Sequence, residues 1–202
     1  MLAYVLTSEL ELSVAGLVLA AGGGRRYGGP KALVRRDDRL LVERAVDTVR
    51  EGGCAPIVVV LGAEAATVRA QADLGDAILV DNPGWKSGMG SSLKVGLEAV
   101  GATDAEAVLV LLVDTPGITA AAVRRVAEKH GPDMLVAATY EGRRGHPVLL
   151  GRDHWGGVAT LATADIGARA YLMARASSVV TVPCEDIADD TDIDVPEVDA
   201  AS

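Results

Sequence analysis

Short, continuous runs of apolar residues recur along the chain and predict β-strands that are buried on both faces. They cover residues 17–20, 57–61, 78–80, 107–113, 134–138, 146–150 and 179–182. Between them apolar residues recur at helical spacing, for example from Leu33 to Val49, where Gly52 ends the pattern. Strands that alternate with helices in this way predict an α/β fold with a mostly parallel sheet. The most apolar run, residues 107–113, is expected to be the central strand.

The first predicted strand ends in a loop that is typical of phosphate binding. Its glycines, residues 22–24, can adopt positive φ and turn backbone N–H groups toward a ligand. Arg25, Arg26 and Lys31 supply the positive charge that a triphosphate requires. A Walker loop is excluded because Pro30 stands where its lysine belongs, and the third glycine of a Rossmann fingerprint is missing. The loop is therefore predicted to bind a nucleotide in another way.

The composition limits the classes of function. With 202 residues the chain is long enough for one domain with a sizeable core, which we place at residues 15–199 after an extension formed by residues 1–14. Because the chain contains no Phe, its core is expected to consist of Val, Leu, Ala and Ile. A formal net charge of −9 argues against sequence-independent binding to nucleic acid.

The cysteines and the apolar runs indicate where the protein works. Cys54 and Cys184 lie far apart and lack a nearby partner, which favours buried thiols in a reducing compartment. No apolar run approaches the roughly 20 residues that a membrane span needs. Glu9 and Glu11 do not fit the basic start of a signal peptide. We therefore expect a soluble, cytoplasmic protein with no membrane partner.

The glycine-rich loop matches the signature Leu-Ala-Ala-Gly-x-x-x-Arg-Met-Gly-x-x-Lys of the nucleotidyltransferases that attach a nucleotide to the molybdenum cofactor. The matching residues are Leu19, Ala20, Ala21, Gly22, Arg26, Gly28 and Lys31, with Tyr27 in place of the usual Met. The chain resembles this family, which implies a three-layer α/β/α sandwich with a Rossmann-like sheet of the nucleotidyltransferase (glycosyltransferase-A-like) type. The resemblance also implies that this loop, with Gly23, Gly24 and Arg25, binds the nucleotide. Arg26 and Lys31 are the implied catalytic cations at the β- and γ-phosphates.

A second motif follows the third predicted strand. Residues 88–93 resemble the family's Gly-Met-x-Ser-Ser-Leu, which implies that Gly88, Ser91 and Ser92 contact the nucleotide. The alternative is that Ser91 and Ser92 cap the next helix, and the two roles are compatible.

Asp114 follows the predicted central strand and begins an Asp-x-Pro motif that ends at Pro116. In the family this aspartate is catalytic and holds Mg²⁺, an ion that takes oxygen ligands and usually only one or two carboxylates. Asp192 and Asp194 are further implied metal ligands because their segment resembles the family's Asp-Ile-Asp-Thr-Pro-Glu. The alternative for Asp114 is a helix cap, although Thr119 is better suited to that role.

Residues Arg144, Gly145, His146 and Pro147 begin a segment that resembles the family's Arg-Gly-His-Pro-Val-Leu. This resemblance implies that they bind the second substrate, on the pterin side of the cleft, where His146 positions it. The following stretch, residues 151–176, has a helical pattern that glycines interrupt. Its residues 153–155 are predicted to contribute to the wall of the second-substrate site.

The resemblance implies a Mg²⁺-dependent transfer of a nucleoside monophosphate from an NTP to the phosphate of a small acceptor, with release of pyrophosphate. The implied acceptor is molybdopterin or its molybdenum-loaded form, and a molybdoenzyme or its chaperone is an implied partner. Ala21 favours CTP, because the family's guanylyltransferases carry Leu-Ala-Gly-Gly at this position. Three alternatives stay open: a guanylyltransferase, an enzyme for another phosphorylated acceptor such as a sugar phosphate, and a chaperone that carries the cofactor without turnover. A glycosyltransferase is disfavoured because Asp114 lacks the second aspartate of an Asp-x-Asp motif.

Overall fold

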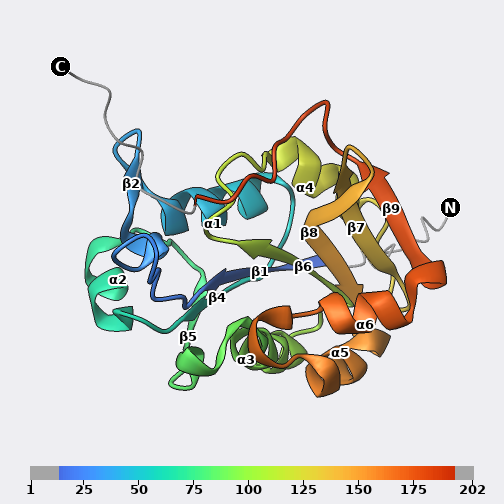
Figure 1. Ribbon diagram of the computed structural model, residues 1–202, viewed down its shortest axis with the longest axis horizontal. Helices are drawn as coiled ribbons and strands as arrows, with labels where there is room; N and C mark the ends of the chain where they lie inside the picture. The colour runs from blue at the N-terminus through green and yellow to red at the C-terminus, as the bar shows by residue number, and fades with distance from the viewer. Residues whose placement is uncertain (1–13, 194–202) are drawn as a thin grey trace, which may run out of the picture.

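A seven-stranded sheet forms the centre of the fold (Figure 1). The computed structural model describes residues 14–193. The strands of the sheet are β1 (Val14–Ala20), β4 (Ile57–Leu61), β5 (Ile78–Asp81), β6 (Ala107–Leu112), β7 (Leu135–Tyr140), β8 (Arg143–Gly151) and β9 (Val179–Pro183). Their order is β5-β4-β1-β6-β8-β7-β9, and β8 runs antiparallel to its neighbours β6 and β7. The predicted strands are all present, the sheet is mostly parallel, and β6 occupies its centre as predicted.

Helices cover both faces of the sheet (Figure 1). They are α1 (Leu41–Glu51), α2 (Ala65–Gln71), α3 (Met89–Gly101), α4 (Ala120–Ala127), α5 (Trp155–Leu161) and α6 (Arg169–Ala174), with short 3-10 helices η1 (Lys31–Leu33), η2 (Trp85–Ser87), η3 (Arg152–His154), η4 (Ala164–Ile166) and η5 (Ala176–Ser178). Residues from α1, α2 and α4 share one core cluster, and residues from α3, α5 and α6 share the other. Consecutive residues of β1 alternate between them, Val18 on the first side and Leu19 on the second. This burial on both faces explains the continuous apolar runs, and it confirms the predicted three-layer sandwich.

The predicted helix from Leu33 to Val49 is wrong in its first part. A small hairpin of β2 (Arg35–Arg36) and β3 (Arg39–Leu40) precedes α1. Asp37 and Asp38 form its turn, with φ of 50° and 62°. Two consecutive positive φ angles match the twist of a two-residue hairpin turn, and aspartate tolerates them better than most residues. The apolar spacing alone gave no sign of this turn.

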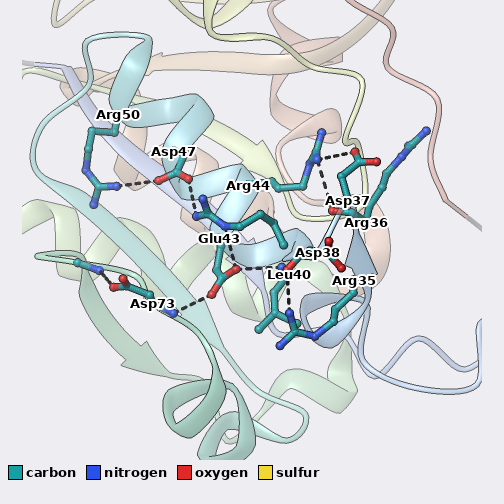
Figure 2. Close-up of polar contacts among 12 residues, drawn as sticks. Arg35, Arg36, Asp37, Asp38, Leu40, Glu43, Arg44, Asp47, Arg50 and Asp73 are labelled. Atoms are coloured by element: carbon teal, nitrogen blue, oxygen red, sulfur yellow. Dashed lines mark hydrogen bonds and ion pairs between the residues drawn. The ribbon is translucent and has the colours of Figure 1, made fainter.

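Glu43 stabilises the junction between the hairpin and α1 through hydrogen bonds (Figure 2). Its Oε2 accepts hydrogen bonds from the Leu40 backbone N (2.9 Å) and from Arg39 Nε (3.2 Å), while its Oε1 accepts one from the Asp73 backbone N (2.9 Å). Burial of Glu43 raises the pKa of its carboxyl, but the hydrogen bonds from Asp73 and Leu40 and the nearby Arg39 more than offset this, so the net pKa is lowered. Glu43 thereby ties three separate stretches of the chain together.

The segment after β9 returns over α4 toward the end of β6 (Figure 1). Thr119 Oγ1 donates a hydrogen bond to the Ile187 carbonyl (3.0 Å), Asp189 N donates to Gly117 O (3.1 Å), and Ile193 N donates to Asp114 O (2.9 Å). The last described residues therefore lie beside the end of the central strand.

The remaining sequence expectations concern the chain ends, the cysteines and the membrane. Val14 pairs with Ala107 in the sheet, so it belongs to β1 rather than to the expected extension. Cys54 and Cys184 are buried free thiols as predicted, and burial raises the pKa of Cys54 to about 12. Within residues 14–193, no helix has both the length and the apolar character that a membrane span requires.

Candidate functional site

Two cavities adjoin at the carboxyl ends of β1 and β6. The first, of about 410 Å³, is lined mainly by residues 21–27 and 85–89 together with Lys31 and Asp114. The second, of about 690 Å³, is lined mainly by residues 143–146 and 165–169 with Leu172, Met173, Asp190 and Asp192. Open α/β sheets bind ligands at this edge of the sheet, so the topology alone favours both cavities as binding sites.

Glycines make the loop of the first cavity possible. At Gly24, where φ is 54°, a Cβ atom would lie 1.9 Å from the Gly29 carbonyl oxygen. The Gly24 carbonyl in turn accepts a hydrogen bond from the Gly28 backbone N (2.9 Å), which closes the loop on itself. At Gly23 a Cβ atom would lie 2.9 Å from the Trp85 ring. The loop therefore requires glycine at residue 24, and Trp85 packs directly against Gly23.

Lys31 and Asp114 meet across the wall of the first cavity. Lys31 Nζ lies 2.8 Å from Asp114 Oδ2, and their side chains are 15% and 23% exposed. Lys31 begins η1 after the glycine-rich loop, and Asp114 stands two residues beyond β6. The fold thus places a cation and a carboxylate that are 83 residues apart in the sequence at one point of the cavity.

Most of the predicted nucleotide-binding residues line the first cavity. They are Leu19, Ala21, Gly22, Gly23, Gly24, Arg25, Arg26, Lys31, Gly88 and Ser92. Ala20 and Ser91 do not line it. Ala20 is 1% exposed because its side chain points into the core on the other face of β1.

Ser91 and Ser92 serve the loop that precedes α3. Asn82 Nδ2 donates hydrogen bonds to Ser91 Oγ (2.8 Å) and Ser92 Oγ (3.0 Å). Gly88 is the N-cap residue of α3, and Ser91 Oγ donates to its carbonyl oxygen (2.9 Å). The alternative that the serines cap α3 is therefore wrong, since neither occupies the cap position.

Asp114 has its carboxylate on the wall of the first cavity and is not a helix cap. Thr119 is the N-cap of α4, where its Oγ1 accepts a hydrogen bond from Ala122 N (3.2 Å). Asp192 lines the second cavity, next to Ile193, whose backbone N donates to Asp114 O. The predicted ligand Asp194 lies outside the described residues.

Within residues 14–193, no group of three or more His, Cys, Asp and Glu side chains gathers as a metal site would require. This donor set nevertheless fits Mg²⁺, which needs only one or two carboxylates and completes its shell with water and substrate phosphates. Asp114 supplies a hard oxygen donor on the wall of a cavity that is large enough for a nucleotide.

The second cavity contains three of the four predicted substrate-binding residues. Arg144, Gly145 and His146 line it, and Pro147 does not. Burial lowers the pKa of the His146 imidazole, although Asp114 and Asp190 act against this, so His146 is neutral near pH 7. A neutral imidazole can both donate and accept a hydrogen bond, which suits a positioning role.

Arg143 and Asp190 form an ion pair at the same wall. Arg143 Nη2 and Nη1 donate to Asp190 Oδ1 and Oδ2 at 2.7 and 3.1 Å. The Asp190 side chain is only 7% exposed, and a Cβ atom at Gly145 would lie 2.0 Å from its Oδ2. Glycine at residue 145 thus makes room for the segment that follows β9.

The prediction for residues 153–155 is wrong, because none of them lines either cavity. Trp155 is buried and its Nε1 donates to the Leu150 carbonyl (2.9 Å). His154 is hydrogen-bonded to Tyr171 Oη (2.9 Å) and to the Asp133 carbonyl (2.8 Å). Their polar groups therefore serve the packing of η3 and α5.

Sequence reasoning missed several residues of both cavities. Trp85 and Lys86 line the first cavity, and Lys86 Nζ lies 5.6 Å from the centre of the Trp85 ring. Asp165 lines both cavities, and Arg169 lines the second. The signal for Trp85 was its place in a strand-to-helix loop, whereas Asp165 and Arg169 lie in the stretch that had no clear pattern.

This chain is similar to known proteins over most of its length. The model of the MobA-like NTP transferase domain matches residues 16–179. A molybdenum cofactor guanylyltransferase from Rhodobacter capsulatus is 31% identical over 71% of this chain and 66% of its own length. The nicotine blue oxidoreductase of Paenarthrobacter nicotinovorans is 40% identical over 91% of this chain and 93% of its own length.

A solved structure shares the fold. The structure of Rv0371c from Mycobacterium tuberculosis in complex with manganese aligns with a TM-score of 0.70 and 26% identity, over 85% of this chain and 88% of that one. MobA-like nucleotidyltransferases generally use a divalent metal ion, which agrees with a carboxylate at the cavity wall. The chain belongs to the family of MobA-like NTP transferase domains and is a nucleotidyltransferase enzyme.

Proposed function

We propose that this enzyme moves a nucleoside monophosphate from an NTP to the phosphate of a small acceptor and releases pyrophosphate, with Mg²⁺ as its metal ion. The observation that carries the proposal is the contact between Lys31 and Asp114, 2.8 Å apart on the wall of the first cavity. A phosphoryl transfer of this kind needs no covalent bond to the protein, so catalysis depends on positioning and on neutralised charge. A cation for the phosphates beside a carboxylate for the metal meets both needs.

Each wall of the first cavity has a distinct role in this proposal. The backbone N–H groups of residues 22–24, with Arg26 and Lys31, hold the β- and γ-phosphates. Asp114, together with Asp192, would hold the Mg²⁺ ion, which when bound stabilises the negative charge that develops on the α-phosphate. Asp194 is a further proposed ligand.

The second cavity takes the acceptor, which we propose is molybdopterin. Arg144 supplies positive charge for its phosphate, and the neutral His146 supplies a hydrogen bond that orients it. The name of the Rhodobacter relative supports this acceptor, since that protein is a molybdenum cofactor guanylyltransferase. A molybdoenzyme or its chaperone is the proposed recipient of the product, and a reducing cytoplasm suits the free thiols.

We base the proposed preference for one nucleotide base over another on Ala21. Ala21 lines the first cavity at a position where the family's guanylyltransferases carry glycine, and on this ground CTP is favoured. The relatives named as guanylyltransferases support GTP instead. Rates with the two nucleotides under identical conditions will decide between them.

The test is an assay of pyrophosphate release over the four NTPs with Mg²⁺ and molybdopterin. We expect release to require the acceptor and to be fastest with CTP. If pyrophosphate is released with the acceptor and GTP but with no other NTP, the proposed reaction stands and the proposed preference for CTP is wrong. Tight binding of molybdopterin without pyrophosphate release from any NTP would overturn the proposal in favour of a cofactor-carrying chaperone.

A second candidate function comes from the relative that is 40% identical along nearly the whole chain and is named an oxidoreductase. Under this proposal the first cavity holds a nicotinamide dinucleotide and the second holds nicotine blue. The loop speaks against it, because the third glycine of a dinucleotide-binding fingerprint is absent. Oxidation of NADH or NADPH that depends on nicotine blue would establish this activity, and its absence would leave the transferase.

A further inference from the structure

The two cavities share four lining residues, namely Leu19, Met89, Leu112 and Asp165. These residues define the junction of the cavities, where an acceptor in the second cavity would approach a nucleotide in the first. Leu19, Met89 and Leu112 are apolar. Asp165 is the one member of the four whose side chain carries charge or can accept a strong hydrogen bond.

Asp165 already contacts the start of α3, which lines the first cavity. Its Oδ1 accepts a hydrogen bond from the backbone N of Met89 (3.3 Å), the first residue of α3. Among residues 14–193 this carboxylate has no cationic partner, although it is exposed. It therefore keeps oxygen lone pairs that a ligand at the junction can use.

The segment that bears Asp165 is pressed against the loop that begins α3. At Gly88, where φ is 109°, a Cβ atom would lie 2.4 Å from the Ala164 carbonyl carbon and 2.7 Å from Asp165 Oδ1. At Gly90 it would lie 2.7 Å from the Ala162 carbonyl carbon. Gly88, the first residue of the nucleotide-binding motif, and Gly90, at its variable position, thus leave room for residues 162–165.

The same segment continues into the wall of the second cavity. Residues 166–169 line that cavity, and a Cβ atom at Gly167 would lie 3.1 Å from Met89 Sδ. Figure 1 shows the connection between α5 and α6 passing beside α3. A movement of this segment on acceptor binding would therefore be transmitted directly to the loop at residues 88–92.

We propose that Asp165 is a positioning residue that links the two substrates. One carboxylate oxygen holds Met89 N and so fixes the nucleotide loop, and the other accepts a hydrogen bond from an N–H or O–H donor of the acceptor. Its negative charge disfavours a phosphate as the direct ligand, so it recognises the uncharged part of the acceptor. This inference rests on the proposed function for the identity of the acceptor.

The first test separates the two contacts by steady-state kinetics. Asn at residue 165 keeps an oxygen for Met89 N but replaces the other oxygen with a donor, so for Asp165→Asn we expect the KM for molybdopterin to rise about tenfold, while the KM for the NTP stays within about twofold. Asp165→Ala removes both contacts and raises both KM values. A merely structural residue would not split them, so an unchanged acceptor KM in Asp165→Asn, or an equal rise in both, overturns the proposal.

The matched control is Asp153→Asn, at an exposed residue of η3 that lines neither cavity. It makes the same chemical change at a site that touches neither substrate. We expect both of its KM values to equal those of the parent.

The second test needs no turnover. Calorimetry measures the affinity for the α,β-methylene analogues of CTP and GTP with and without molybdopterin. We expect molybdopterin to tighten nucleotide binding about fivefold in the parent and not at all in Asp165→Ala, as linkage between two sites requires. If the parent releases no pyrophosphate, the proposed transfer is wrong, but the linkage between the two ligands still tests the role of Asp165. Loss of the linkage in Asp165→Ala supports that role. A linkage that persists in Asp165→Ala overturns it.

Discussion

The charged residues around α1 and those around the first cavity differ in how many of them have a partner of opposite charge within the chain. On the hairpin and α1, arginines have carboxylates at contact distance: Arg39 Nη2 lies 2.7 Å from Asp47 Oδ2, and Arg44 Nη1 lies 3.0 Å from Asp37 Oδ2 (Figure 2). At the first cavity Lys31 is paired with Asp114, but within residues 14–193 Arg25 makes neither a hydrogen bond nor an ion pair, and Lys86 only faces the Trp85 ring.

This difference separates charges that hold the fold from charges that serve a ligand. A charged side chain that has its partner within the chain contributes to stability, and removal of the partner leaves it without compensation. The cavity instead gathers cations in a chain whose net charge is −9, and a bound polyphosphate would balance them. Substitutions at the cavity should therefore lower activity more than stability, and substitutions at α1 should do the reverse.

The largest effect is expected for Asp114→Asn. This change keeps the size of the side chain and removes its charge, so turnover should fall about 1,000-fold, because the charge that a bound metal stabilises develops mainly in the transition state. Nucleotide binding without Mg²⁺ should survive. Pyrophosphate release at saturating Mg²⁺ measures the effect, with Asp104→Asn, an exposed loop residue, as the control. Equal rates for Asp114→Asn and the parent would remove Asp114 from the mechanism.

Lys31→Ala should rank second. The loss of a cation from the phosphate site should lower turnover about 100-fold, with an unchanged circular dichroism spectrum. The exposed Lys94 on α3 provides the matched substitution, Lys94→Ala, which should have normal activity. Normal activity in Lys31→Ala, with the fold intact, would contradict the phosphate assignment.

Glu43→Gln tests the other side of the comparison. The amide can accept only one of the two backbone N–H groups that the Glu43 oxygens bind, so the free energy of unfolding should fall by about 1–3 kcal/mol with kcat unchanged. Chemical denaturation measures it. Asp37→Asn, at an exposed ion pair, should have a smaller effect.

The stabilisation that the Glu43 carboxylate provides should depend on pH in a defined direction. Because the pKa of Glu43 is lowered in the folded state, its stabilisation is fully present above the pKa of the unfolded chain and is lost as the pH falls through the folded value. The difference between the parent and Glu43→Gln should therefore shrink in acid. A difference that grows below pH 4 would show that another group is responsible.

Ala21→Gly should have the smallest effect. Removal of the methyl group of Ala21, a residue that lines the first cavity, should shift the ratio of CTP to GTP turnover several-fold toward GTP, less than the roughly tenfold or more that a methylene in a closed hydrophobic pocket produces. The ratio of kcat/KM values measures it. An unchanged ratio would show that base choice resides elsewhere in the cavity.

The sequence predicted the sheet well because its strands β1, β4, β6 and β7 are buried on both faces and read as continuous apolar runs, whereas the edge strands β5 and β9 are more exposed. Lys31 and Asp114 were found because each stands in a family motif directly after a predicted strand, and the structure shows that these strands, β1 and β6, are adjacent. The hairpin was missed because Asp37 and Asp38 form a turn through backbone conformation, without Gly or Pro. Asp165 was missed because its role depends on contacts with residues 88–90, far away in the sequence.

The contact between Ile193 N and the Asp114 carbonyl means that the site is completed late in biosynthesis. The glycine-rich loop leaves the ribosome directly after β1, whereas the segment that reaches Asp114 leaves only after β9, the last strand of the described residues. A nascent chain that ends after β9 could pair all the strands of the sheet and still lack Asp190 and Asp192, which line the second cavity. Activity should therefore appear only when the segment that contains Ile193 has emerged, after the sheet has gained its protection against proteolysis.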